Sequence, residues 1–246
     1  MLRVGLFLFF SGLMVLLHSV EAQTVHVKYK KFIVPGKTEY GRWMSSPEMK
    51  RRMREREEMM ANSVSEYYDL YSNGRNSFFA YDTTIQTIEI EEGNPWWGGR
   101  NEFKESFAKD VPKGEVTLRS ELLADTVCTV WNYKEKYRWQ AGDGMRVFAD
   151  LRCEKMIHID DESGDSTIVW YTPSIPIADG PEDYGGAPGM ILAVEAPAYN
   201  YIAEEIEVGS FAMPKKPMSE EACLTKKEFQ ELARNEMIKK YINRKN

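Results

Sequence analysis

The stretch of residues 170–197, WYTPSIPIADGPEDYGGAPGMILAVEAP, constrains the fold more than any other part of the chain. It holds five of the eleven prolines and four of the seventeen glycines. Proline fixes φ and removes a backbone donor, and glycine accepts positive φ values, so this central segment is expected to hold one rigid shape. The apolar run of residues 190–194 that follows indicates a strand against a core. The stretch is therefore a scaffold, and it supplies no nucleophile, general base or metal-ligand set.

The N-terminus has the pattern of a cleavable signal peptide. Arg3 gives a positive start, residues 4–17 are apolar or small, and Val20 and Ala22 stand at the −3 and −1 positions of a cleavage site. The apolar run is shorter than the roughly 20 residues that cross a bilayer as a helix. We therefore expect residues 1–22 to be removed and residues 23–246 to form one domain, periplasmic or secreted. No cysteine follows the cleavage point, so a lipoprotein is not expected.

Composition narrows the classes of partner. A net charge of −6 argues against nucleic acid as a ligand, and 43% hydrophobic residues are typical of a folded globular protein. Three cysteines remain after processing: Cys128, Cys153 and Cys223. An exported chain can form one disulfide and keep one free thiol, or all three can be buried thiols. None belongs to a C-x-x-C pair or lies beside a histidine, so we expect no zinc site and no cofactor.

A first strand is predicted over residues 24–34, and a helix begins near Ser46 and Pro47. In this helix Met49, Met53, Met60 and Val64 share one face. Together with Met59, these methionines could bind Cu(I), but methionine at helical spacing is usual in cores. The basic run of residues 50–56 could contact lipid head groups, although the interspersed glutamates favour a solvated, salt-bridged face.

The clearest hairpin signal joins residues 67–71 to residues 76–81 through an Asn-Gly turn at Asn73 and Gly74. Another strand is expected over residues 84–91. Trp96 and Trp97 then lie in a Gly/Pro loop, where they could form the aromatic lip of a weak ligand-binding surface or close an end of the core.

The middle of the chain is rich in β signals. A short helix is predicted over residues 102–109, followed by strands over residues 115–122, 126–131, 136–140, 145–159 and 166–171. The short connections force neighbouring strands to be antiparallel. A last strand is expected over residues 199–208, and a terminal helix begins at a capping box formed by Thr225 and Glu228. The pattern predicts an α+β fold, in which a curved antiparallel meander carries an N-terminal and a C-terminal helix packed on it.

Within the central segment, residues 187–190 suit a type II turn with Pro188 at its second position and Gly189 at the positive-φ third position. Pro173 and Pro176 must end the pairing of the strand that precedes them.

At these residues the chain resembles the GLPGLI family, exported proteins typical of the Bacteroidota. The eponymous motif corresponds to residues 186–192, with Ala187 and Met190 in place of leucines. The resemblance rests on order and spacing over residues 67–208, and Asp150 and Met156 depart from the family's Gly and Ala. The residues that match the family pattern are Trp139, Cys153, Trp170, Tyr171, Pro173, Pro176, Gly180, Pro181, Gly186, Pro188 and Gly189.

The resemblance implies a half-barrel-like sheet similar to the lipoprotein-carrier folds and a non-enzymatic envelope protein. Its members are often found beside outer-membrane receptors of the TonB-dependent type. Such a receptor, or a lipid-like ligand on the hollow face of the sheet, is therefore the expected partner. The family carries no activity that could be transferred, so the motif residues are expected to be structural.

One enzymatic alternative remains open. His158 and Asp160 lie two residues apart, on one face of a strand, and precede the acidic stretch from Asp161 to Asp165. This cluster could support a metal-assisted hydrolase, although an acidic turn containing a glycine is the ordinary end of a hairpin.

Overall fold

The computed structural model describes residues 24–34, 66–84, 105–122, 125–214 and 223–225, together with individual residues within 47–58 and 227–235. Statements about structure below concern this part of the chain. The predicted signal peptide, the segment with Trp96 and Trp97, and Met49, Met53, Met59 and Met60 lie outside it.

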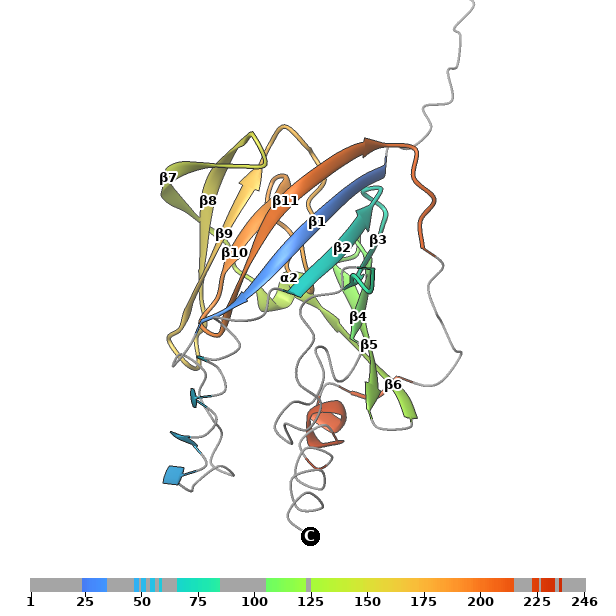
Figure 1. Cartoon of the computed structure of the whole chain (residues 1–246), viewed down its shortest axis with the longest axis vertical. Coiled ribbons are helices and arrows are strands. Elements are labelled where there is room, and N and C mark those ends of the chain that lie inside the picture. Colours follow the sequence, from blue (N-terminus) through green and yellow to red (C-terminus); the bar gives the residue numbers. More distant parts are fainter. Residues whose placement is uncertain are drawn as a thin grey trace, which may run out of the picture.

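One eleven-stranded antiparallel sheet dominates the structure (Figure 1). The strands are β1 (Thr24–Ile33), β2 (Glu66–Ser72), β3 (Asn76–Tyr81), β4 (Ser106–Asp110), β5 (Glu115–Leu122), β6 (Asp125–Asn132), β7 (Gln140–Phe148), β8 (Leu151–Ile159), β9 (Ser166–Thr172), β10 (Met190–Glu195) and β11 (Tyr199–Gly209). A four-residue helix, α2 (Tyr133–Lys136), separates β6 from β7.

The strand order is β6-β5-β4-β3-β2-β1-β11-β10-β9-β8-β7. Each strand except β1 and β11 pairs only with neighbours in sequence, and the long pairing of β1 with β11 joins the two halves. The two edge strands, β6 and β7, are consecutive in sequence and lie at opposite ends of the sheet in Figure 1. The predicted antiparallel meander is confirmed, and the sheet is open.

Alternation of side chains defines one face of the sheet as the interior face. Val25, Val27 and Tyr29 of β1, Leu70 of β2 and Phe79 of β3 are buried on it. Strand β10 is buried throughout residues 190–194, as its continuous apolar run predicts.

Three predicted elements are wrong. Residues 106–110, expected at the end of a helix, form β4, because pairing with β3 and β5 buries Phe107 and Lys109 on the interior face. Residues 136–140 are not a strand: the side chain of Asn132 accepts a hydrogen bond from the Lys134 N–H and starts α2. Residues 145–159 form the β7–β8 hairpin, turned by Ala149 and Asp150 with φ values of 45° and 61°.

The turn proposed around Gly189 is also wrong in its mechanism. Gly189 does not take a positive φ, whereas Gly186 does, at 83°. A Cβ on residue 189 would lie 2.2 Å from the carbonyl oxygen of Thr172, so the backbones of β9 and of the entry to β10 approach too closely for any side chain. Close approach, and not turn geometry, requires this glycine.

The predicted N-terminal and C-terminal helices are confirmed where their residues are described. Within 47–58 the described residues are helical and exposed, and Arg51 pairs with Glu55 at 2.5 Å, which supports a salt-bridged face over lipid contact. The Thr225–Glu228 capping box forms, since each residue's backbone N–H donates to the other's side chain. Phe229 is 9% exposed and belongs to the hydrophobic core. Packing of the helices on the sheet stays a prediction.

One disulfide forms, between Cys128 of β6 and Cys223, and Cys153 is a buried free thiol. Beside the disulfide, the Leu224 N–H donates to the Cys128 carbonyl oxygen at 2.7 Å, so the segment that follows β11 returns to cover part of the β6 edge. Among the residues that the structure describes, no helix has the length and apolar character needed to span a membrane.

Candidate functional site

The connection from β9 to β10, residues 173–189, lies against the interior face of the sheet and is tied to it by acidic side chains. Its own shape is fixed by backbone hydrogen bonds, with Met190 N–H donating to Ile175 O, Gly186 N–H to Ala178 O and Ile191 N–H to Asp179 O. Asp179, Glu182 and Asp183 then each bind a lysine from a different element. The predicted rigidity of the central segment therefore has a structural basis.

Asp179 makes the deepest of these contacts. Its carboxylate lies 2.6 Å from the Lys109 ammonium of β4, and both side chains are fully buried. The ammonium also donates to the carbonyl oxygens of Gly180 at 2.5 Å and Tyr184 at 3.1 Å. Gly180 itself leaves no room for a side chain, since a Cβ there would lie 2.8 Å from the Cβ of Ile191.

Glu182 joins the segment to β1 and β11. The hydroxyls of Tyr199 and Tyr201 donate to its two carboxylate oxygens at 2.8 and 2.6 Å, and Lys31 approaches to 3.4 Å. Glu182 has a φ of 45°, which is uncommon for a residue with a side chain and is often found at functional sites. Burial, followed by the charge of Glu182, raises the pKa of both tyrosines, so their hydroxyls stay protonated donors.

Lys31 and a second carboxylate complete a rim site, which we define as Lys31, Tyr68, Glu105, Glu182 and Tyr199. The Lys31 ammonium lies 4.5 Å from the ring centroid of Tyr199 and 5.5 Å from that of Tyr68, within cation–π range. Burial, and then the negative charge of Glu182, raises the pKa of Glu105. The rim site thus combines a carboxyl group whose pKa is raised with a carboxylate held by hydroxyl donors and a lysine.

Asp183 fixes α2 and the edge strand β6. It accepts hydrogen bonds from the Tyr137 hydroxyl at 2.8 Å and the Trp131 indole at 3.0 Å, and it pairs with Lys136 at 2.7 Å. These three contacts bring the end of β6 and the C-terminal end of α2 onto the central segment.

The residues of the family pattern surround the same segment. The Trp139 indole donates to the Gly185 carbonyl oxygen at 2.8 Å and stacks on Tyr137. Pro181 accepts the Tyr184 N–H, and Gly186 supplies the positive φ beside Trp139. The structure thus brings together Trp139, Gly180, Pro181 and Gly186.

Trp170, Tyr171 and Cys153 lie in the β8–β10 part of the sheet. The Trp170 indole donates to Glu195 at 2.9 Å, and the Arg146 guanidinium lies over its ring. The Tyr171 hydroxyl donates to Glu154 at 2.7 Å, which, together with burial, raises its pKa to about 12. Burial raises the pKa of the Cys153 thiol to about 11, so this thiol is not an activated nucleophile.

His158 and its acidic neighbours do not converge on a common point. His158 is 8% exposed, its ring packs on Tyr137 and Trp139, and its Nδ1 accepts the Arg138 N–H at 3.2 Å. Asp160 turns the β8–β9 hairpin by accepting backbone N–H groups of Ser163 and Glu162, which lower its pKa. Asp161 pairs with Arg138 in solvent. Within the described residues, no cluster of three or more His, Cys, Asp or Glu side chains is placed to hold a metal ion.

The buried lysines at the interior face were not predicted from the sequence, although the spacing of residues along their strands indicates them. Lys31 follows Val25, Val27 and Tyr29 at the same two-residue spacing, and Lys109 follows Phe107 in the same way. A lysine on the apolar side of an alternating strand requires a buried partner. The acidic stretch at residues 179–183 is the matching signal.

Taken together, the fold and the site define an open antiparallel-sheet domain whose interior face is occupied by its own acid-anchored connection. A family model described as "Protein of unknown function (Porph_ging)" matches residues 127–193, which is less than half of the chain and runs from β6 to β10. No curated protein matches the sequence.

Two solved structures are similar in fold. They are described as the "Structure of PNGF-II" in the C2 and the P21 space groups, and both align with a TM-score of 0.56 over 87% of this chain, at 12% and 13% identity. This chain spans about a third of their length, with 33% and 34% of those chains covered. At such identities the likeness shows the fold alone.

Proposed function

We propose that this chain is an exported, non-enzymatic accessory protein of the GLPGLI type, which docks on an outer-membrane receptor in the cell envelope. The family pattern over residues 139–189 supports this proposal, because its residues build a rigid internal scaffold and leave no activated nucleophile among them. The signal-peptide pattern of residues 1–22 supports export to the periplasm or the medium.

A single observation favours docking over enclosure of a lipid-like ligand: the connection of residues 173–189 covers the interior face through the Lys31, Lys109 and Lys136 pairs. In a half-barrel of the lipoprotein-carrier kind, this face would receive the apolar ligand. Here a ligand would first have to displace a fully buried ion pair, which costs several kcal/mol when one partner is left alone, on the order of 3–5.

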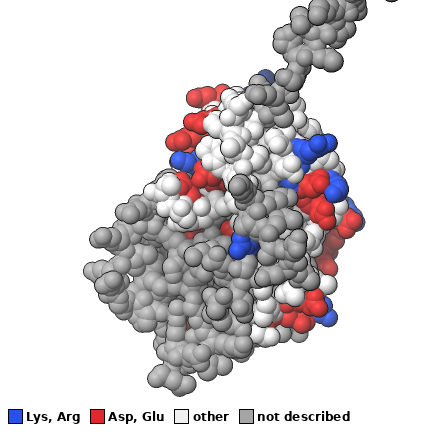
Figure 2. Space-filling view, turned by 90° about the vertical axis from the view of Figure 1, so that its right-hand side faces the viewer, with Lys and Arg blue, Asp and Glu red and all other residues white. Residues whose placement is uncertain are grey.

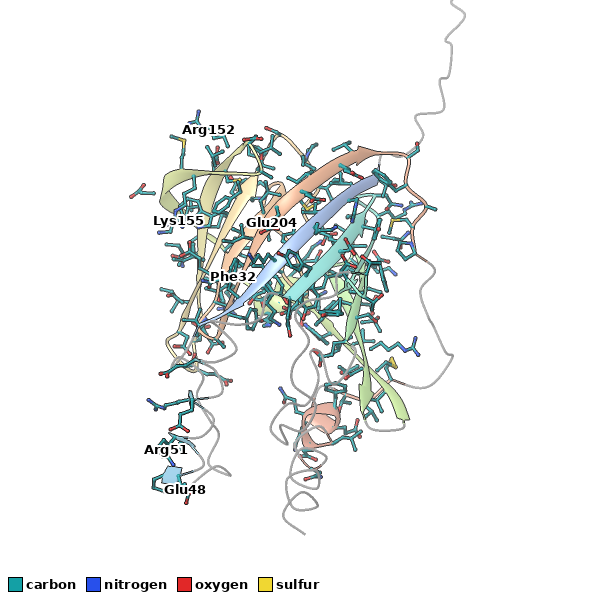
Figure 3. The ribbon with its side chains drawn as sticks, viewed as in Figure 1. Phe32, Glu48, Arg51, Arg152, Lys155 and Glu204 are labelled. Carbon is teal, nitrogen blue, oxygen red and sulfur yellow. A yellow bond between two sulfur atoms is a disulfide. The ribbon has the colours of Figure 1, made fainter. Side chains whose placement is uncertain are left out.

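The edge strand β7 supports a docking role. Its outer side has no neighbouring strand in the described part of the sheet, and Met145 and Val147 are 58% and 67% exposed on it. In Figure 3, Arg152 lies at the tip of the same hairpin, where its guanidinium contacts the Met145 sulfur. An unpaired edge with exposed apolar side chains is a template for a strand of another protein.

Elsewhere, among the described residues on the face shown in Figure 2, the surface has no large patch of a single charge sign that would attract a strongly charged partner. On the face shown in Figure 2, acidic and basic side chains are interspersed. This pattern agrees with the ion pairs between β1 and β11, in which Lys28 and Lys30 face Glu205 and Glu204.

Affinity capture from the cell envelope, with mass spectrometry of both proteins and lipids, tests the proposal. We expect a receptor of the TonB-dependent type to be captured, and reciprocal capture from that receptor to return this chain. Val147→Lys should reduce recovery at least tenfold. Val208→Lys is the matched control, because Val208 is a 53% exposed residue on β11, away from the edge. Recovery of one bound lipid per chain, with no receptor, would overturn the docking assignment.

Acid–base chemistry at the rim site is a second candidate, favoured by the raised pKa of Glu105 beside Glu182. Two carboxyl groups in one site can act as acid and base when their environments push their pKa values apart. Turnover of a hydrolysable substrate that is lost in both Glu105→Gln and Glu182→Gln would support it. Wild-type binding of the receptor with unchanged affinity in both variants, and no turnover, would exclude it.

A further inference from the structure

The contact between Lys109 and Asp179 differs in its burial from the other lysine–carboxylate pairs in the described part of the chain. Both side chains have 0% exposure, whereas Lys31 and Lys136 of the other two segment pairs are 19% and 40% exposed. The pair joins β4 to the middle of the central segment, and the Lys109 Nζ lies 2.6 Å from the Asp179 Oδ1. Solvent water does not reach either group.

The acceptors around Lys109 orient its nitrogen. Two N–H groups donate to the carbonyl oxygens of Gly180 and Tyr184, and the remaining tetrahedral position of Nζ faces the carboxyl group. The third N–H of this nitrogen therefore points at the Oδ1 of Asp179, which holds Nζ beside the carboxyl group. Reacting groups fixed at about 3 Å gain effective concentrations far above those in solution.

The carboxyl group of Asp179 is incompletely satisfied as an anion. Its Oδ1 accepts the Gly180 N–H at 2.8 Å and the Lys109 ammonium, but its buried Oδ2 has no hydrogen-bond partner among the residues that the structure describes. A buried ion pair compensates for the loss of hydration only when the remaining lone pairs are also bonded. A reaction that removes both charges from this interior is therefore favoured.

From this geometry we propose that Lys109 and Asp179 condense into an intramolecular amide, an isopeptide bond between β4 and the central segment. A proton moves from Nζ to Oδ1, and the nitrogen lone pair attacks Cγ to give a tetrahedral intermediate. A second proton passes from the nitrogen to the same oxygen, the Cγ–Oδ1 bond breaks, and Oδ1 leaves as water. The three N–H hydrogens are thus divided into one amide N–H and two on water, and no oxidant or co-reactant is required.

The surroundings suit the product. The amide is neutral, so the two buried charges disappear, and the exclusion of water from the site opposes hydrolysis. The neighbouring hydroxyls of Tyr29 and Tyr133 already donate to the carbonyl oxygens of Ile191 and Val111, so the lysine and the aspartate exchange the protons between themselves. The bond would lock the connection onto the sheet covalently, independently of any docking function.

Intact-mass measurement of the full chain under denaturing conditions tests the proposal directly. We expect a mass lower than that of the sequence with one disulfide by one water molecule, about 18 Da, in a fraction that grows on incubation. Tryptic digestion should yield two peptides joined through Lys109 and Asp179. Lys109→Arg and Asp179→Ala should each restore the full mass, and this readout does not depend on whether the variants fold.

Lys31→Arg is the matched control, because Lys31 pairs with Glu182 of the same segment but is partly exposed. It should retain the loss of one water. If folded wild-type protein keeps its full mass after prolonged incubation, the proposal is overturned. Lys109 and Asp179 would then form a permanent ion pair.

Discussion

Gly189 lies directly against the backbone of Thr172, so that a Cβ on residue 189 would come within 2.2 Å of the Thr172 carbonyl oxygen and 3.1 Å of the Pro173 Cα. Neither of these groups is the end of a flexible side chain that could move aside. The place where β9 stops and β10 begins is therefore set by contact between two backbones, and Pro173, which cannot donate to a ladder, stands where pairing ends.

Gly189→Ala is expected to destabilise the protein by about 3 kcal/mol or more, because a backbone contact at this distance forces the strands apart. Gly209→Ala is the matched control. Gly209 ends β11 without a positive φ, and its nearest neighbour would be the Phe211 ring at 3.4 Å. Its effect should stay within about 0.5 kcal/mol. Urea unfolding of the two variants gives the comparison, and equal losses would contradict the contact argument.

Asp150→Gly should stabilise the β7–β8 hairpin. Asp150 has a φ of 61°, a left-handed value that costs residues with a Cβ about 1 kcal/mol. A gain of that size is expected in thermal or chemical unfolding. Asp143→Gly, within β7 and without a positive φ, should instead lose about 0.5–1 kcal/mol, since glycine there only adds freedom to the unfolded chain. A loss in both variants would show that the Asp150 side chain matters more than its backbone.

Removal of the Cys128–Cys223 disulfide is expected to cost about 4 kcal/mol, because the bond closes a long loop in the unfolded chain, with a sequence separation of 95. Cys128→Ser combined with Cys223→Ser should also speed hydrogen exchange of the Leu224 amide, which donates to the Cys128 carbonyl oxygen across the β6 edge. Unchanged exchange there would mean that hydrogen bonding alone holds the returning segment.

Cys153 should resist alkylation in the folded protein. Burial raises its thiol pKa to about 11, which leaves little thiolate at neutral pH, and the side chain has no exposed surface. Iodoacetamide should therefore label no cysteine in native protein and one after unfolding without reduction. Labelling of the native chain at a rate close to that of a free thiol would contradict the burial of this residue.

Glu105 should make stability depend on pH. Its folded pKa is raised above the unfolded value, so the folded state binds more protons between the two values. Its effect on stability is most favourable below the unfolded pKa and becomes less favourable as the pH rises through the folded pKa. Glu105→Gln, which keeps the neutral shape of the side chain, should flatten the pH profile of stability above pH 4.5, the ordinary pKa of this group.

Strand positions were predictable wherever alternation and turn residues agreed. The β2–β3 hairpin follows from Gly74, which takes a φ of 76°, although Asn73 contributes through its side chain, which accepts the Arg75 and Asn76 N–H groups. The β7–β8 turn was missed because no glycine marks it and Ala149 is an unusual residue at positive φ. Strand β4 was missed because Lys109 interrupts its apolar pattern and is tolerated only through Asp179, 70 positions later in sequence.

The position of the candidate site in the chain was predictable from the sequence, but the ion pairs that form it were not. The proline and glycine content of residues 170–197 identified the rigid segment, yet nothing local to it reveals which lysines its acids meet. Lys31, Lys109 and Lys136 come from three elements that only the sheet topology brings together. Contacts of this kind depend on strand order, which single-sequence patterns do not encode.

The pairing of β1 with β11, in which Thr24 lies opposite Gly209, also determines when the molecule can finish folding. During synthesis β2 follows β1 directly, whereas β11, the second partner of β1, is the last strand in sequence. Until then one side of β1 exposes unsatisfied amides, and the two halves remain separate meanders. Closure of the sheet therefore depends on a long-range pairing of strands, which is intrinsically slow to form.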